Sequence, residues 1–124
     1  MSDIKTYKDL LVWQKSVNLS LELYKLTEKF PDSEKFGIIN QIRRASISIS
    51  SNIAEGWGRN STKNYIQFLR MSRGSLLEIE STLYISEKLN YLNSTDYSKL
   101  CGIIEEISKM LNKLISTLET KINV

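Results

Sequence analysis

A chain of 124 residues is long enough to bury one modest hydrophobic core, but too short for a catalytic domain with a separate binding domain. Its 41% hydrophobic and 25% charged residues are ordinary for a globular protein and unlike a disordered one. The chain has no histidine, which removes the commonest metal ligand and the usual acid–base residue near neutral pH, so we expect no metal, no cofactor and no enzymatic activity.

The sequence also bears on location. Residues 1–5 lack the basic-then-apolar pattern of a signal peptide, and no run approaches the roughly 18 apolar residues of a membrane span. The single cysteine, Cys101, lies in an apolar helical stretch where a buried free thiol is expected. We therefore expect a cytoplasmic protein that does not enter the membrane.

The first predicted helix runs from about residue 7 to 30 and ends where Phe30 precedes Pro31, the only proline. Its main apolar stripe at three-to-four spacing is Leu10, Trp13, Val17, Leu21 and Tyr24. A second stripe beside it is Leu19, Leu23, Leu26 and Phe30. Both tryptophans, Trp13 and Trp57, fall on such stripes, so packing is favoured over stacking on nucleobases.

The second predicted helix covers about residues 33–57, with Asp32 or Ser33 as its cap and Gly56 and Gly58 at its end. Its stripe is Ile38 or Ile39, Ile42, Ala45, Ile49, Ile53 and Trp57. Residues 45–50 alternate between apolar and polar, as a half-buried strand would. We favour the helix because its stripe continues unbroken through this segment and no partner strand exists.

The third predicted helix covers about residues 61–90, with Asn60 or Ser61 as its cap. One line along it is Tyr65, Leu69, Ser72, Leu76, Ile79 and Leu83, with Ile66, Leu77 and Tyr84 beside that line. The fourth covers about residues 94–121, opened by Ser94 or Thr95 with Asp96. Its stripe, in alternating steps of four and three, is Leu100, Ile104, Ile107, Leu111, Leu114 and Leu118.

Four helices joined by short connections must lie antiparallel to their sequence neighbours. The sequence therefore predicts an all-α fold, an antiparallel up-down-up-down four-helix bundle, with residues 1–124 as a single domain.

Positive charge is concentrated in the middle of the chain. The window 41–75 holds six cations and one acid, Glu55, whereas the rest of the chain holds 11 cations and 13 acids. Arginine presents a planar fork of donors that suits phosphate. The candidate nucleic-acid-binding residues are Arg43, Arg44, Arg59, Lys63 and Arg70.

Other polar and apolar residues of this window suggest structural roles. Arg73 and Glu80, seven residues apart, fall within the apolar stripe of the third helix, so we expect Arg73 to be a structural ion-pair residue. A polar strip along the second helix, typical of a solvated face, is Gln41, Arg44, Ser48, Asn52, Glu55 and Arg59. A second apolar line on that helix predicts a subunit interface and consists of Phe36, Ile47 and Ala54.

Several segments resemble one family of proteins, the bacterial four-helix-bundle proteins encoded in 23S rRNA intervening sequences. The segments are 37–45, 48–56 and 58–59, the pair Gly74-Ser75 followed by Glu78 and Glu80, and 11–14 with Phe30-Pro31. The matching residues are Gln41, Arg43, Arg44, Asn52, Glu55, Gly56, Arg59, Gly74, Ser75 and Glu80. Ser46 and Ser72 stand where the family often has alanine.

The resemblance implies a four-helix bundle that assembles as a ring-like homopentamer. It also implies kinship with the accessory variability determinant proteins of diversity-generating retroelements, basic pentamers that bind nucleic acid and a reverse transcriptase.

Two functional hypotheses follow. The first is a non-enzymatic, oligomeric protein that binds structured RNA or another nucleic acid through an arginine-rich face. The alternative is a protein-interaction scaffold, in which the arginines are structural or interfacial and the assembly recruits a protein partner.

Overall fold

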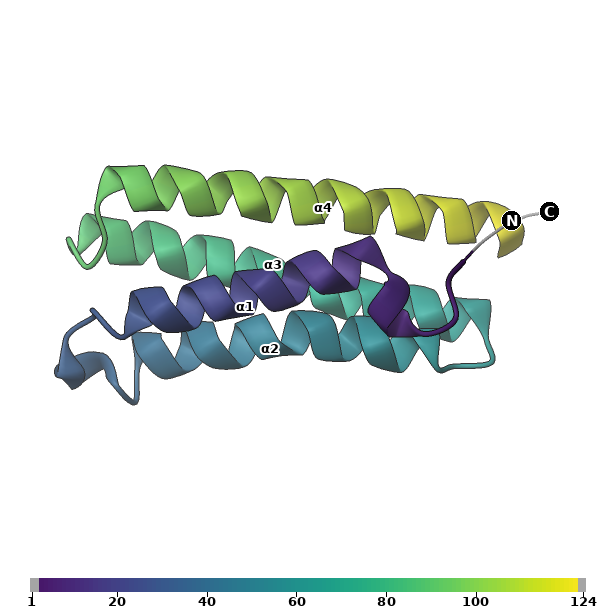
Figure 1. Ribbon diagram of the computed structural model, residues 1–124, viewed down its shortest axis with the longest axis horizontal. Helices are drawn as coiled ribbons and strands as arrows, with labels where there is room; N and C mark the ends of the chain where they lie inside the picture. The colour runs from purple at the N-terminus through teal and green to yellow at the C-terminus, as the bar shows by residue number, and fades with distance from the viewer. Residues whose placement is uncertain (1–2, 123–124) are drawn as a thin grey trace.

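The computed structural model describes residues 3–122 as four long α-helices and two single 3₁₀ turns (Figure 1). The elements in chain order are η1 (Tyr7–Asp9), α1 (Leu11–Thr27), η2 (Asp32–Glu34), α2 (Ile38–Trp57), α3 (Thr62–Lys88) and α4 (Ser94–Ile122). Helices adjacent in sequence run antiparallel, and α4 returns to lie beside α1. The described residues contain no strand, so the predicted all-α four-helix bundle is confirmed.

The core lies between the predicted stripes of α2, α3 and α4. Every apolar side chain expected on the α2 stripe between Ile39 and Ile53 is buried, and the same holds for α3 between Leu69 and Leu83. In α4 the stripe shifts by one residue at its end, where Ile115 is buried and Leu114 is only partly buried. Periodicity therefore identified three of the four core faces.

The main stripe predicted for α1 was wrong only in part, since Leu10 is buried and Trp13 packs against the core. Leu21 is 58% exposed, whereas Leu19 and Leu23 of the second stripe are fully buried. The buried face of α1 also includes Ser16 and Thr27, whose hydroxyls donate to the carbonyls of Val12 and Leu23, four residues back. Because these hydroxyls are satisfied locally, polar residues can occupy the core face, and a hydrophobic pattern misses them.

Helix boundaries differ from the predictions at two caps. Residues 32–34 form the separate turn η2, and α2 begins only at Ile38, whose amide donates to Glu34 Oε1 at 3.3 Å. The other carboxylate oxygen of Glu34 accepts the hydroxyl of Tyr91 at 2.8 Å, which ties the α1–α2 connection to the α3–α4 connection. Asn93, rather than Ser94 or Thr95, caps α4 by accepting the Asp96 amide at 2.7 Å.

The start and the end of α3 both fit their local sequence. Ser61 caps α3 as predicted, since its hydroxyl accepts the Asn64 amide at 3.3 Å. After α3, Asn90 adopts φ 64°, the left-handed conformation that asparagine tolerates at helix ends. Figure 1 shows where the connections lie. The α2–α3 connection is at one end of the bundle, together with the C-terminal turn of α4, and the other two connections are at the opposite end.

The helices α2 and α3 approach each other closely. The Ser72 hydroxyl, fully buried, donates to the Ile49 carbonyl at 2.8 Å, and the Ser75 and Ser48 hydroxyls are 2.9 Å apart. Gly56 is buried where the two helices meet the turn. A Cβ there would lie 2.9 Å from both Phe68 Cβ and Tyr65 Cδ1, too close for any other residue without displacement.

We expect Gly56→Ala to lower the free energy of unfolding by about 1–3 kcal/mol, because the added methyl group overpacks the contact with Tyr65 and Phe68. Gly58→Ala is the matched control, since a Cβ there has no atom nearer than 3.6 Å. Urea denaturation at one protein concentration measures both variants. Equal stability of the Gly56→Ala variant and the parent would contradict the proposed close contact.

Candidate nucleic-acid interface

The guanidinium of Arg43 makes its contacts within its own chain. Its Nε donates to Thr27 Oγ1 at 2.9 Å, and its Nη2 donates to the Tyr24 carbonyl at 3.2 Å. The guanidinium also lies over the Tyr24 ring at 4.5 Å. Because the bonded groups close the C-terminal turn of α1, Arg43 connects α1 to α2, and two of its five N–H donors are already used within the chain.

Two further arginines point toward α4. Arg70 Nη2 lies 2.7 Å from Glu119 Oε2, with both side chains 44% exposed, so this pair is weak and open to solvent. Arg73 Nη1 donates to Asn112 Oδ1 at 2.9 Å. The predicted ion pair of Arg73 was wrong: its partner is a neutral amide. Glu80 is exposed, so its carboxylate stays in water.

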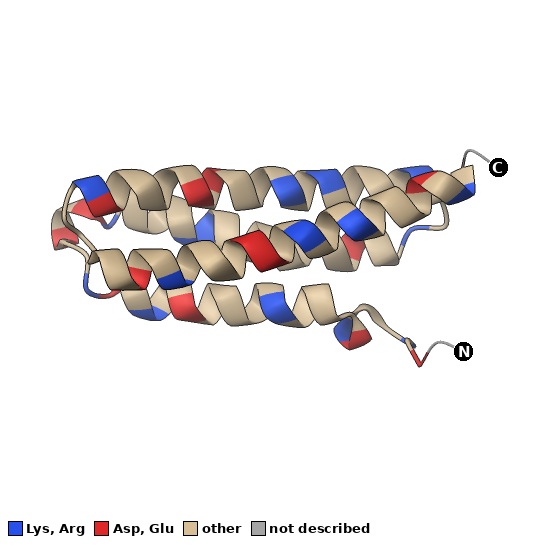
Figure 2. Ribbon diagram, turned by 90° about the horizontal axis from the view of Figure 1, so that it is seen from above, with Lys and Arg blue, Asp and Glu red and all other residues tan. Residues whose placement is uncertain are grey.

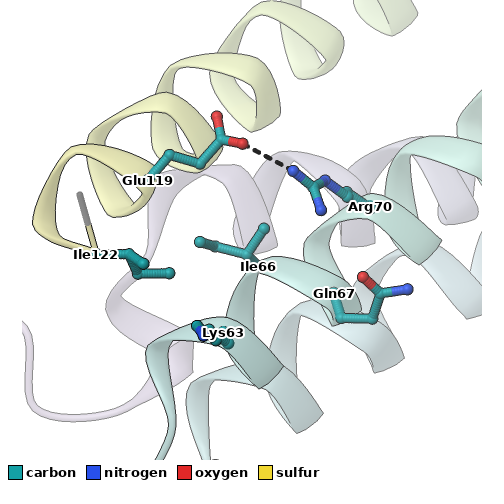
Figure 3. Close-up of a pocket in the computed structure, with 6 residues that line it drawn as sticks. All are labelled: Lys63, Ile66, Gln67, Arg70, Glu119 and Ile122. Carbon is teal, nitrogen blue, oxygen red and sulfur yellow. Dashed lines mark hydrogen bonds and ion pairs between the residues drawn. The ribbon is translucent and has the colours of Figure 1, made fainter.

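The two remaining cations of the middle window lie where α2 turns into α3. Arg59 is exposed and sits over the Phe68 ring at 4.8 Å, which holds the guanidinium at the surface. Lys63 lies one turn further on, at the rim of a cleft of about 300 Å³ between α3 and α4. In Figure 3 Arg70 of α3 points to Glu119 of α4, Ile66 lies between the two helices near Ile122, and Lys63 and Gln67 lie on the same part of α3.

The segment around these cations contains no acid. Between Glu55 and Glu78 the sequence has four cations and no aspartate or glutamate. Elsewhere Lys and Arg are intermixed with Asp and Glu along the helices, as the ribbon in Figure 2 shows. Within residues 3–122, neither Arg59 nor Lys63 has a carboxylate partner. The turn end is therefore the part of the window where unpaired cations lie within a segment free of acids.

Arg44 occupies a different surface. It is exposed and lies in a groove of about 490 Å³ between α2 and α3, which Glu78 also lines. At 1.5 Å rise per residue, Arg44 lies roughly 20 Å along α2 from its last residue, Trp57, after which Arg59 follows. The floor of this groove is ordered by Asn52 Nδ2, which donates to the Ser48 carbonyl at 2.8 Å and to its hydroxyl at 3.0 Å.

The other motif residues fall on both sides of this groove. Gln41 and Ser75 line it, whereas Glu55 is exposed nearer the turn and Gly74 is exposed on α3. Of the residues predicted for an interface, Phe36 is 88% exposed at the rim of the groove, and Ile47 is 48% exposed. Ala54 is partly buried. The first half of the polar strip of α2, from Gln41 to Ser48, is thus part of one wall of a groove whose other wall is α3.

The partners of these arginines were beyond sequence reasoning. Asn112 and Glu119 lie 39 and 49 residues from the arginines that they bind, so no local pattern reveals them. Tyr65 was expected on the core line, and its hydroxyl is buried without a partner among the described residues. Burial raises the pKa of Tyr65 above its ordinary value, so the phenol stays neutral.

The remaining side chains offer little other chemistry. Between residues 3 and 122, no three His, Cys, Asp or Glu side chains gather where they would hold a metal ion. No helix in this range combines the length and apolar character needed to cross a bilayer. Cys101 is partly buried rather than fully buried, and a hydrogen bond to it raises the pKa of Tyr97.

The fold and these surfaces define an all-α four-helix bundle protein with a polar groove between α2 and α3 and a basic turn at its end. The family model for 23S rRNA-intervening sequence proteins matches residues 8–113, and the chain belongs to that family. No match was found among curated proteins.

A solved structure agrees with this assignment. The crystal structure of a protein of unknown function from the S23 ribosomal protein family of Bacteroides thetaiotaomicron is similar to this chain with a TM-score of 0.76 and 25% identity. The alignment covers 85% of this chain and 98% of the other.

We expect Arg43→Ala to lower the free energy of unfolding by about 1–2 kcal/mol, since it removes two hydrogen bonds and the contact with the Tyr24 ring. Arg44→Ala, at the adjacent exposed position, should change it by less than about 0.5 kcal/mol. Thermal and urea unfolding compare the two variants. A smaller effect at Arg43 than at Arg44 would contradict the structural role of Arg43.

Proposed function

We propose that this protein is a non-enzymatic, oligomeric RNA-binding protein that contacts phosphate groups through the α2–α3 turn and the first turns of α3. The observation that carries this proposal is the pair of exposed cations, Arg59 and Lys63, without a carboxylate partner in the described chain and within a segment free of acids. Such a surface attracts a polyanion without first breaking an internal ion pair.

The surroundings of these cations suit phosphate and sugar contacts. The ring of Phe68 supports the guanidinium of Arg59, which lowers the conformational entropy that binding must remove. Asn60, Asn64 and Gln67 add exposed amide donors on the same segment. Arg70 can exchange its solvent-exposed pairing with Glu119 for a phosphate at little cost.

A structured RNA is the partner that we propose, in keeping with the rRNA intervening sequences in the family's name. A single patch of two or three cations binds weakly at physiological salt. A homopentamer, the assembly implied by the resemblance, would present five such patches and gain affinity through avidity.

We expect Arg59→Ala and Lys63→Ala each to weaken binding of a structured RNA by about three- to tenfold at low salt. The slope of log K against log salt should fall by about 1 for each phosphate that the variant no longer neutralises. Fluorescence anisotropy with a labelled RNA hairpin at several salt concentrations measures both quantities, after light scattering has shown an unchanged mass for each variant.

The matched control removes two cations elsewhere. The control variant carries Lys29→Ala and Lys35→Ala. These two lysines lie at the opposite end of the bundle, in a segment that also contains exposed acids such as Glu28 and Asp32. This control should bind RNA like the parent. If it lost as much RNA affinity as the Arg59→Ala and Lys63→Ala variants, binding would depend on net charge and not on the position of the cations. Absent or salt-insensitive RNA binding by the parent would favour the scaffold hypothesis, with the groove of Arg44 and Glu78 as the first surface to examine.

A further inference from the structure

The groove between α2 and α3 holds two opposite charges that do not pair with each other. Arg44 of α2 and Glu78 of α3 both line it, and both side chains are exposed. Within residues 3–122, neither the guanidinium nor the carboxylate has an ion-pair or hydrogen-bond partner. Both groups therefore keep their hydrogen-bonding capacity for a molecule that enters the groove.

The register of the two helices places these side chains on facing walls at one level of the groove. The hydroxyls of Ser48 and Ser75 lie 2.9 Å apart between α2 and α3. Arg44 lies four residues before Ser48, and Glu78 lies three residues after Ser75. Because the helices run antiparallel, both are about one turn from the serine pair in the same direction. A molecule in the groove thus meets a fork of donors on one side and two acceptor oxygens on the other.

The floor and the rim of the groove offer further contacts. The Ser48 hydroxyl already accepts Asn52 Nδ2 at 3.0 Å and shares one hydrogen bond with Ser75, so one hydroxyl proton of the serine pair has no acceptor in the described chain. Gln41 adds an exposed amide, and the ring of Phe36 at the rim is 88% exposed. A groove of about 490 Å³ with several hydrogen-bonding groups and one aromatic surface suits a flat, polar ring.

The geometry points to an unpaired guanine nucleotide of RNA as the ligand of this groove. One edge of guanine carries the acceptors O6 and N7, which suit the fork of Arg44, and the adjacent edge carries the N1–H and N2–H donors, which suit the carboxylate of Glu78. This inference rests on the proposed function and names the base that the RNA would present. The groove lies roughly 20 Å from the end of α2, a distance that a few nucleotides of single-stranded RNA span.

The carboxylate of Glu78 distinguishes guanine from other ligands. A phosphate is repelled by a carboxylate, so contact with the RNA backbone alone gives no reason for Glu78 to face Arg44. Adenine presents the acceptor N1 where guanine presents N1–H, and cytosine and uracil have no N7. A free amino acid could also join the two charges through its carboxylate and ammonium groups, but these groups make no use of the aromatic surface at the rim. The test therefore includes one amino acid.

The test titrates the full chain, freed of RNA by nuclease, with free nucleotides and follows binding by ligand-observed NMR. Guanosine monophosphate should bind saturably, with a Kd on the order of 1 mM. Adenosine monophosphate has the same ribose and phosphate and should bind about tenfold more weakly or not at all. Inosine monophosphate, which lacks only the N2 amine, should lose about three- to tenfold, because one of the two donors to Glu78 is missing.

Variants assign the binding to the two charged walls. Arg44→Ala and Glu78→Ala should each lower the affinity for guanosine monophosphate by about tenfold, and thermal unfolding should show that both variants fold, since both positions are exposed. Glu80→Ala is the matched control, because Glu80 is an exposed carboxylate of α3 that does not line the groove. In the Glu78→Ala variant the guanosine and inosine nucleotides should bind equally, a result that a general loss of structure would not produce.

The inference is overturned if guanosine monophosphate does not bind, if the adenosine nucleotide binds equally well, or if Glu78→Ala loses no more affinity than Glu80→Ala. Binding of free L-phenylalanine in place of the nucleotide would instead show a site for amino acids. These titrations contain no RNA, and the variants Arg59→Ala and Lys63→Ala should leave them unchanged. Failure of the groove to bind guanine is therefore distinguishable from failure of the turn end to bind RNA.

Discussion

The close contact between α2 and α3 is the constraint on which the described surfaces depend. Gly56 allows the helices to meet at the turn, and the Ser72 hydroxyl donates to the Ile49 carbonyl at 2.8 Å between them. Together these contacts fix how far one helix is displaced along the other. This register places Ser75 against Ser48, and so forms the floor of the groove that Arg44 and Glu78 line.

Clustering of arginines in the sequence is not clustering in space. Successive residues of an α-helix are rotated by about 100°, so Arg43 turns toward α1 while Arg44 faces the groove. Arg70 and Arg73 are three residues apart and both reach α4, where Glu119 and Asn112 engage them. Among the described residues, Arg44 in the groove and Arg59 and Lys63 at the turn end have no such partner, and only the turn end lies in a segment free of acids. The basic surface is therefore smaller than the arginine-rich window indicated.

Sequence reasoning identified the fold because packing between the helices of a bundle requires a periodic apolar stripe in the local sequence of each helix. The α4 stripe is visible since one helix face must be apolar over its whole length, however its partners are arranged. The α1 stripe failed in part because its buried face includes Ser16 and Thr27, which bond within their own helix. The partners of Arg43 and Arg73 were not predictable, since a bundle's sequence gives the faces of its helices but not the side chains that meet between them.

The assembly proposed together with the RNA-binding patch has a geometric consequence that follows from symmetry alone. In a closed ring, equivalent points of all copies lie on one circle around the axis. If copies of the chain form such a ring, every α2–α3 turn lies at the same height along that axis. The weak basic patches would then form one ring of positive charge, with a spacing set by the subunit contact. Assembly would thus determine which RNA shapes can engage several patches at once.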